Sequence, residues 1–150
     1  METNGLLFFV PGIPVQQGSK VYGVTRDGRP YGREAAGAKL HKWRNAMRDA
    51  AYSEMVHLGR SGPMIPSGRP VWVEALYHYA PLKSKPSADW KVSAPDLDKL
   101  LRSSLDSLSG LVYDDDKQVC LLNTWKRYAK VDQEPGVWVL VAELEERYTV

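Results

Sequence analysis

Alternation of apolar and polar positions predicts the β-strands of this chain. The clearest alternation covers residues 71–79, and both of its alternating sets contain apolar side chains. A strand that is apolar on both sides is usually central and covered on both faces. Shorter apolar runs at residues 6–10, 119–128 and 137–143 predict three further strands. We therefore expect one sheet of four strands, with residues 71–79 in a central position.

Apolar residues spaced three and four apart predict two helices. The first covers residues 38–57, where Leu40, Trp43 and Met47 lie on one stripe. The second covers residues 97–108, ends before Gly110, and turns five leucines toward the core: Leu97, Leu100, Leu101, Leu105 and Leu108. The order β-α-β-α-β-β predicts an α+β fold. We expect a mixed sheet packed with helices in two layers, in a single domain over residues 1–150.

Two connecting segments combine basic and aromatic side chains. Residues 16–37 lack clear periodicity and are expected to form a long loop or a hairpin; they contain Lys20, Arg26, Arg29, Arg33, Tyr22 and Tyr31. Such a mixture can grip a phosphate backbone and stack on exposed bases, although an ordinary surface loop can have the same composition. Residues 82–94 contain Trp90 and three lysines: Lys83, Lys85 and Lys91.

Charge and cysteine content narrow the class of protein. The formal net charge is +2, but residues 1–95 carry thirteen Lys and Arg against seven Asp and Glu, whereas residues 96–150 carry seven against eleven. A basic half joined to an acidic half is compatible with a nuclease that binds phosphates and cations, and also with ordinary surface charge. The single cysteine, Cys120, excludes an internal disulfide and suits a reducing compartment. Its strand-like surroundings predict a small residue in or near the core.

Several other classes of protein find no support in the sequence. No apolar run is long enough to cross a bilayer, and the N-terminal residues lack the pattern of a secretory signal. The three histidines are far apart, and no Cys/His cluster predicts a zinc site. Walker A, dinucleotide-binding and nucleophile-elbow motifs are also missing.

Carboxylates are concentrated between Pro95 and Val119. Asp96 and Asp98 open the second helix, and residues 114–116 are three consecutive aspartates after it. Oxygen ligands suit Mg²⁺, which is usually held by one or two carboxylates together with water and substrate phosphate oxygens. Because one short helix can return the chain to the same end of a sheet, we expect the two groups to form a metal site.

A purely structural interpretation of these carboxylates is also open. Asp96 could cap the helix, Asp98 could favour the positive end of the helix dipole, and residues 114–116 could form a solvated turn. Asp98, Arg102 and Asp106 are spaced four apart and share one stripe of the helix. As a surface feature this stripe would amount to an ion pair between Asp98 and Arg102, worth about 0.2–0.5 kcal/mol.

The ordered motif over residues 95–119 resembles the RusA family of Holliday junction resolvases. It consists of Pro-Asp-x-Asp-x-Leu from Pro95, a helix containing Asp106 and ending at Gly110, and Tyr-Asp-Asp-Asp-x-Gln-Val from Tyr113. A weaker similarity lies at residues 12–14, where Gly-Ile-Pro follows the first apolar run. The motif covers about a sixth of the chain, and its fixed carboxylate spacing and helix length make it specific.

The resemblance implies an enzyme with a defined set of site residues. Asp96, Asp98 and Asp116 would be the essential carboxylates, with Asp115 beside them as a further metal ligand. Arg102 stands where the family has a functional lysine, and it would stabilise charge developing on the scissile phosphate. Lys99 stands where the family usually has asparagine. The implied cofactor is Mg²⁺, with Mn²⁺ as a possible substitute.

The resemblance also implies partners and a cellular setting. A homodimer would cut four-way DNA junctions by paired symmetric nicks in the cytoplasm of a bacterial cell or a phage-infected host. The expected DNA-binding residues are Lys83, Lys85, Lys91 and Lys99. Two alternatives are a non-catalytic branched-DNA-binding protein and a nuclease of broader choice that cuts flaps or forks. The first would not need clustered carboxylates, because they repel phosphate in the absence of a metal.

Overall fold

The computed structural model describes residues 5–18, 20–34 and 37–145. Four strands form a mixed sheet in the order β1-β6-β4-β5. They are β1 (Gly5–Pro11), β4 (Val71–Tyr79), β5 (Val119–Tyr128) and β6 (Gly136–Glu143). β4 and β5 are parallel, whereas β6 is antiparallel to β1 and to β4. The predicted α+β fold and the central position of residues 71–79 are confirmed.

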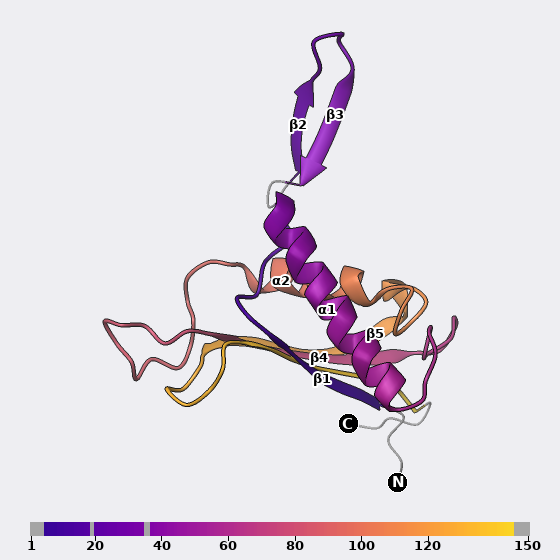
Figure 1. Ribbon diagram of the computed structural model, residues 1–150, viewed down its shortest axis with the longest axis vertical. Helices are drawn as coiled ribbons and strands as arrows, with labels where there is room; N and C mark the ends of the chain where they lie inside the picture. The colour runs from indigo at the N-terminus through magenta and orange to yellow at the C-terminus, as the bar shows by residue number, and fades with distance from the viewer. Residues whose placement is uncertain (1–4, 19, 35–36, 146–150) are drawn as a thin grey trace.

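Two helices lie on the same face of this sheet (Figure 1). They are α1 (Gly37–His57) and α2 (Leu97–Leu108), and a short 3-10 helix, η1 (Asp116–Gln118), leads into β5. The core between helices and sheet contains Trp43 and Met47 from α1, Leu100 from α2, and Val73 and Tyr77 from β4. No helix within the described ranges is long and apolar enough to span a membrane.

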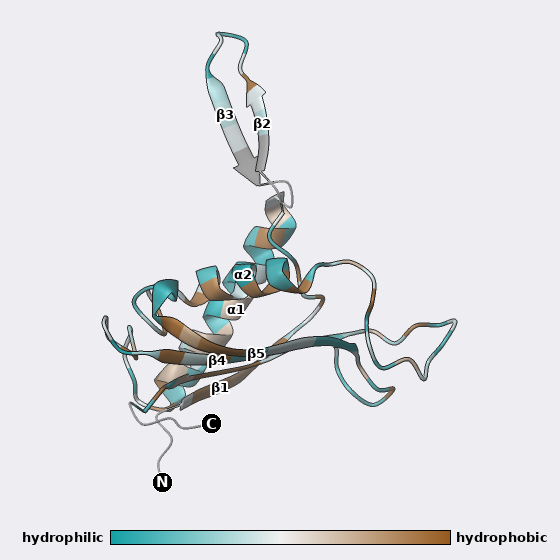
Figure 2. Ribbon diagram, turned by 180° about the vertical axis from the view of Figure 1, so that it is seen from behind, coloured by the Kyte–Doolittle hydropathy of each residue, from teal (hydrophilic) through white to brown (hydrophobic). Residues whose placement is uncertain are grey.

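The buried face of α2 contains serines as well as leucines. Leu100 and Leu108 are buried as expected, but the other leucines of the helix are only partly buried, and their places in the interior are taken by Ser103, Ser104 and Ser107. Ser104 Oγ and the Tyr77 hydroxyl are 2.7 Å apart and form a buried hydrogen bond. A buried tyrosine hydroxyl needs such a partner. Hydrophobic and hydrophilic residues alternate in short stretches along the ribbon of α2 in Figure 2, and its leucines belong to or pack against the core.

The second face of the sheet is open, which corrects two expectations. Alternate residues of β4 are fully buried, but Trp72, Glu74 and Leu76 on its other face are only partly covered. Both helices pack on one side of the sheet, so the expectation that this strand is covered on both faces is wrong. Cys120 is exposed near the start of the edge strand β5, so its expected place in or near the core is also wrong.

A second, separate sheet consists of the hairpin formed by β2 (Lys20–Val24) and β3 (Pro30–Glu34). It stands away from the body of the protein, beyond the N-terminal end of α1 (Figure 1). The segment over residues 16–37 therefore contains a hairpin rather than a long loop. These two strands are missing from the predicted element order.

Candidate active site

Asp96 precedes the first turn of α2 at the N-cap position, but its side chain makes no capping hydrogen bond. Its Oδ2 lies 3.4 Å from Lys99 Nζ, and the side chain is 61% exposed. The backbone N–H of Asp96 donates to Gln16 Oε1 at 2.9 Å. The capping interpretation therefore does not explain this carboxylate, which stays open to a ligand from solution.

The backbone around Asp96 is tied to two other parts of the fold. Lys126 of β5 donates through Nζ to the carbonyl oxygens of Ser93 at 2.7 Å and Pro95 at 2.6 Å. From the segment 15–18, which we call the strap, the Gln17 N–H donates to the Lys99 carbonyl at 3.1 Å. The start of α2 is consequently held from both the sheet and the strap.

Asp98 and Arg102 are exposed on successive turns of α2. The surface alternative pairs them, but no ion pair joins them in the part of the chain that the structure describes. Within those same residues, the guanidinium of Arg102 also makes no hydrogen bond that would occupy it. Its charge is thus directed outward on the same stripe as the Asp98 carboxylate.

Asp115 caps the start of η1. Its side chain accepts a hydrogen bond from the Lys117 N–H at 2.9 Å, and the Asp115 N–H donates to Gln118 Oε1 at 2.9 Å. Gln118 Nε2 in turn donates to the carbonyl oxygens of Pro66 at 2.8 Å and Arg69 at 3.0 Å. The hydrogen bond from Lys117 lowers the pKa of Asp115. This capping box fixes the turn that carries Asp116.

Asp116 lies among other carboxylates. Partial burial, then the neighbouring carboxyl groups of Asp115 and Asp106, raise its pKa. A raised pKa is expected where carboxylates are close together without a cation to neutralise them. Because the group is all oxygen, its chemistry suits Mg²⁺.

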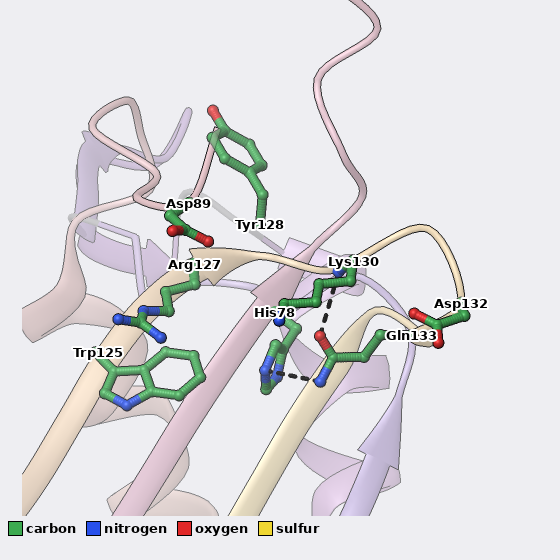
Figure 3. A pocket seen from close by; sticks show the side chains of 8 residues that line it. All are labelled: His78, Asp89, Trp125, Arg127, Tyr128, Lys130, Asp132 and Gln133. Atoms are coloured by element: carbon green, nitrogen blue, oxygen red, sulfur yellow. Dashed lines mark hydrogen bonds between the residues drawn. The ribbon is translucent and has the colours of Figure 1, made fainter. Parts of the chain in front are cut away.

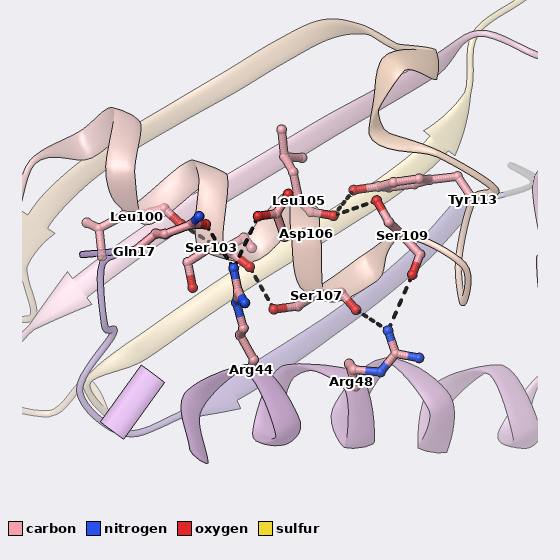
Figure 4. A network of polar contacts seen from close by, with 11 residues as sticks. Gln17, Arg44, Arg48, Leu100, Ser103, Leu105, Asp106, Ser107, Ser109 and Tyr113 are labelled. Atoms are coloured by element: carbon pink, nitrogen blue, oxygen red, sulfur yellow. Dashed lines mark hydrogen bonds and ion pairs between the residues drawn. The ribbon is translucent and has the colours of Figure 1, made fainter. Parts of the chain in front are cut away.

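Asp106 is held by a network that the sequence did not reveal (Figure 4). Arg44 of α1 donates through Nη2 to Asp106 Oδ2 at 3.1 Å and to Gln17 Oε1 at 2.8 Å. Arg48, one turn later, donates to the carbonyl oxygens of Ser107 at 2.7 Å and Ser109 at 3.3 Å. Arg44 and Asp106 are 62 residues apart, so no local spacing could have indicated the contact.

The carboxylates lie toward opposite ends of α2. Asp98 and Asp106 are eight residues apart on this helix, which corresponds to about 12 Å along its axis, and Asp116 lies beside Asp106. The expectation that both groups return to one end of the sheet is therefore not met within one chain. Among the residues that the structure describes, no three His, Cys, Asp or Glu side chains converge to hold a metal ion.

The four lysines expected to bind DNA differ in their surroundings. Lys83 and Lys85 are exposed in the loop before α2. Lys91 Nζ lies 4.9 Å from the ring centre of Tyr79 and donates to Ser93 Oγ at 3.0 Å. Lys99 is the ion-pair partner of Asp96. Lys83 and Lys85 are thus the two that DNA could reach without displacing an internal contact.

A pocket of about 520 Å³ lies away from these carboxylates, at the end of β4 and β5 (Figure 3). Its lining residues are His78, Asp89, Trp125, Arg127, Tyr128, Lys130, Asp132 and Gln133. The Arg127 guanidinium stacks 3.9 Å from the ring centre of Trp90 and 5.0 Å from that of Trp125. Burial lowers the pKa of His78. None of the candidate carboxylates lines the pocket, so we place the chemistry at α2 and η1.

Comparison with models of known protein families identifies the family of this chain. A family model described as Endodeoxyribonuclease RusA matches residues 14–142. The chain belongs to the RusA family. The match extends from the strap to β6 and includes every residue of α2 and η1. Membership identifies the protein as an endodeoxyribonuclease of a Holliday junction-resolving family. No curated protein matches the chain.

Proposed function

We propose that this RusA-family protein is a Mg²⁺-dependent endonuclease that resolves four-way DNA junctions by paired symmetric nicks. The family match over residues 14–142 carries the proposal. The outward-facing carboxylates of α2 and η1 support it, because exposed negative charge would weaken DNA binding unless a cation is bound there. The enzyme would act in the cytoplasm of a bacterial cell or a phage-infected host.

The residues that would hold the ion are Asp96, Asp98 and Asp116, with Asp115 beside them. Mg²⁺, or Mn²⁺ in its place, would supply an activated water and neutralise the oxygen that leaves the phosphate. The chain itself fixes the carboxylates, through Gln16 at one end of α2 and the capping box of η1 at the other. Arg102 would stabilise charge on the scissile phosphate, since its guanidinium is exposed on the stripe between them.

The separation along α2 supports a site shared between two copies of the chain. Mg²⁺ needs oxygen atoms at 2.0–2.1 Å, so one ion cannot reach ligands about 12 Å apart on a helix. A two-fold axis passing near Arg102 would bring Asp98 of one copy close to Asp116 of the other copy. Such a C2 homodimer has two equivalent sites. Two sites related by a two-fold axis are also what paired nicks across a four-way junction require.

A cleavage assay on four substrates tests the proposal. A four-way junction, a fork, a flap and a linear duplex of the same sequence are incubated with the protein in Mg²⁺, and in EDTA as control. We expect the junction to be cut fastest, by nicks in two opposing strands, and no cutting in EDTA. Equal cutting of flaps and forks would replace the resolvase by a nuclease of broader choice. Junction binding without any cleavage would leave a non-catalytic binder.

A further inference from the structure

The β2–β3 hairpin is a separate unit, and over its described residues it packs extensively against no helix or strand of the body. It forms a two-stranded sheet of its own and projects beyond α1 (Figure 1). An isolated two-stranded hairpin is at best marginally stable in water. The hairpin therefore needs stabilising contacts within itself or with a partner. Its own residues provide the first, and its exposed side chains offer a surface for the second.

Internal support comes from two tyrosine–glycine pairs. Tyr22 is paired with Gly32, and Tyr31 with Gly23. A Cβ atom at Gly23 would overlap the ring of Tyr31, and one at Gly32 would lie 3.1 Å from the ring of Tyr22. Because neighbouring residues of a strand point to opposite faces, one tyrosine covers each face of the hairpin. Each ring therefore occupies the space that a side chain at the opposite glycine would need.

The hairpin tip is ordered and basic. The Thr25 N–H donates to the Arg29 carbonyl at 2.9 Å, and Gly28 closes the turn with φ +84°. The Thr25 hydroxyl donates to Asp27 Oδ1 at 2.6 Å, which lowers the pKa of that carboxyl. Arg26 and Arg29 are exposed beside it, and Asp27 lies 3.4 Å from Arg29. The turn therefore presents two guanidinium groups on a defined backbone.

The exposed surface of the hairpin is suited to binding nucleic acid. Among the hairpin side chains that the structure describes, two exposed arginines, Arg26 and Arg29, stand against one acidic residue, Asp27. Tyr22 remains 76% exposed and Tyr31 43% exposed, although each covers a glycine. The major groove of B-DNA, about 12 Å wide, admits a two-stranded β-ribbon. A basic two-stranded ribbon with a tyrosine on each face suits the width and the negative charge of that groove.

We infer that the β2–β3 hairpin is a DNA-binding arm that lies in the major groove of a duplex next to the cleavage site. Arg26 and Arg29 contact phosphates at the groove edge, and the tyrosine on the face turned to the DNA meets the base edges. This inference rests on the proposed function, because it takes DNA as the substrate. It adds a contact surface separate from α2 and from the lysines of residues 82–94.

The test measures DNA affinity against salt concentration in EDTA, so that cleavage does not enter. The variant is Arg26→Ala with Arg29→Ala, and the matched control is Arg26→Lys with Arg29→Lys, which keeps both charges. Losing two phosphate contacts in each chain, four in the proposed homodimer, should reduce the slope of log K against log salt by about 3.6, and weaken binding by well over tenfold at about 0.1 M salt. The lysine control should keep the wild-type slope.

A second measurement locates the hairpin on DNA. Dimethyl sulfate modifies guanine N7, which faces the major groove. Wild type should protect guanines in one duplex arm, and a variant with residues 20–34 replaced by a short Gly-Ser linker should lose that protection. Its thermal unfolding should still be cooperative, because the hairpin forms a sheet of its own.

Each alternative outcome is distinct. An alanine variant with an unchanged salt slope, together with unchanged protection in the linker variant, overturns the inference. Loss of self-association in the linker variant, with DNA binding intact, would assign the hairpin to a second copy of the chain and also overturn it. Failure of the wild type to bind any DNA would instead contradict the proposed function.

Discussion

The helix α2 and the β2–β3 hairpin are supported in opposite ways. Both ends of α2 are anchored to other elements, by Lys126 before its first turn and by Arg48 at its last turn. The contacts that shape the hairpin are made between its own residues, in the Tyr–Gly pairs and the turn at Thr25. In the roles proposed above, the side chains that need fixed positions for chemistry lie on a packed helix. Recognition of a large polymer can use an element that only has to reach it.

This difference leads to separable effects of mutation. Changes to the carboxylates and to Arg102 should alter the rate of cleavage without weakening DNA binding. Changes on basic loops and on the hairpin should alter affinity and its salt dependence.

The largest expected effect is at the start of α2. Asp98→Asn and Asp96→Asn should each abolish cleavage of a four-way junction, because asparagine keeps the shape but lacks the charge of a metal ligand. Junction binding in EDTA should be preserved or strengthened, because a negative charge that repels phosphate is removed. Single-turnover cleavage in Mg²⁺ and gel-shift binding in EDTA measure the two effects. Asp49→Asn, an exposed change on α1, is the matched control and should leave both unchanged. Near wild-type cutting by the Asp98 variant would remove this residue from the site.

The second largest effect on the cleavage rate is expected at Arg102. Arg102→Ala is expected to lower the single-turnover rate by about 10²–10³, the usual cost of removing one transition-state donor. Arg102→Lys should keep substantial activity, because arginine is a poor proton donor and its role would be electrostatic. A wild-type rate in the alanine variant would leave Arg102 as an ordinary surface residue.

A smaller effect is expected in the loop before α2. Lys83→Ala with Lys85→Ala should reduce the salt slope of junction binding by up to about 3.6, since each lost phosphate contact removes about 0.9 and the proposed homodimer loses two in each chain. The pair Lys83→Arg and Lys85→Arg keeps the charges and is the control. Identical salt dependence in wild type and alanine variant would show that DNA does not reach this loop.

The smallest effect concerns Asp116 and stability. Because its pKa is raised in the folded protein, Asp116 favours the fold when protonated, and this contribution disappears as pH rises through the folded pKa. Asp116→Asn should therefore slightly raise Tm at pH 7 without metal, and by less at pH 4. Asp114→Asn, at the exposed neighbouring position, is the control for thermal unfolding. An unchanged or lower Tm at pH 7 would contradict the crowding of carboxylates at this end of α2.

The leucine periodicity of residues 97–108 and the alternation of residues 71–79 predicted α2 and β4 with their observed bounds, because local amphipathicity sets such elements. The features that the sequence did not predict depend on packing between distant segments. The contact of Arg44 with Asp106 joins two helices. Exposure of Cys120 depends on its place in an edge strand. The carboxylate motif indicated the candidate residues, and their role as metal ligands stays a prediction. That Asp116 lies beside Asp106 depends on the turn after α2, which the sequence did not reveal.

The most direct test of the shared site mixes two inactive proteins. Asp98→Asn and Asp116→Asn chains carrying different affinity tags are co-expressed, and the heterodimer is purified through both tags. If each site combines the Asp98 end of one chain with the Asp116 end of the other, the heterodimer has one intact site and one doubly altered site. We predict that it nicks one strand of a four-way junction, whereas neither parent homodimer cuts. A purified heterodimer as inactive as its parents would contradict a site shared between chains.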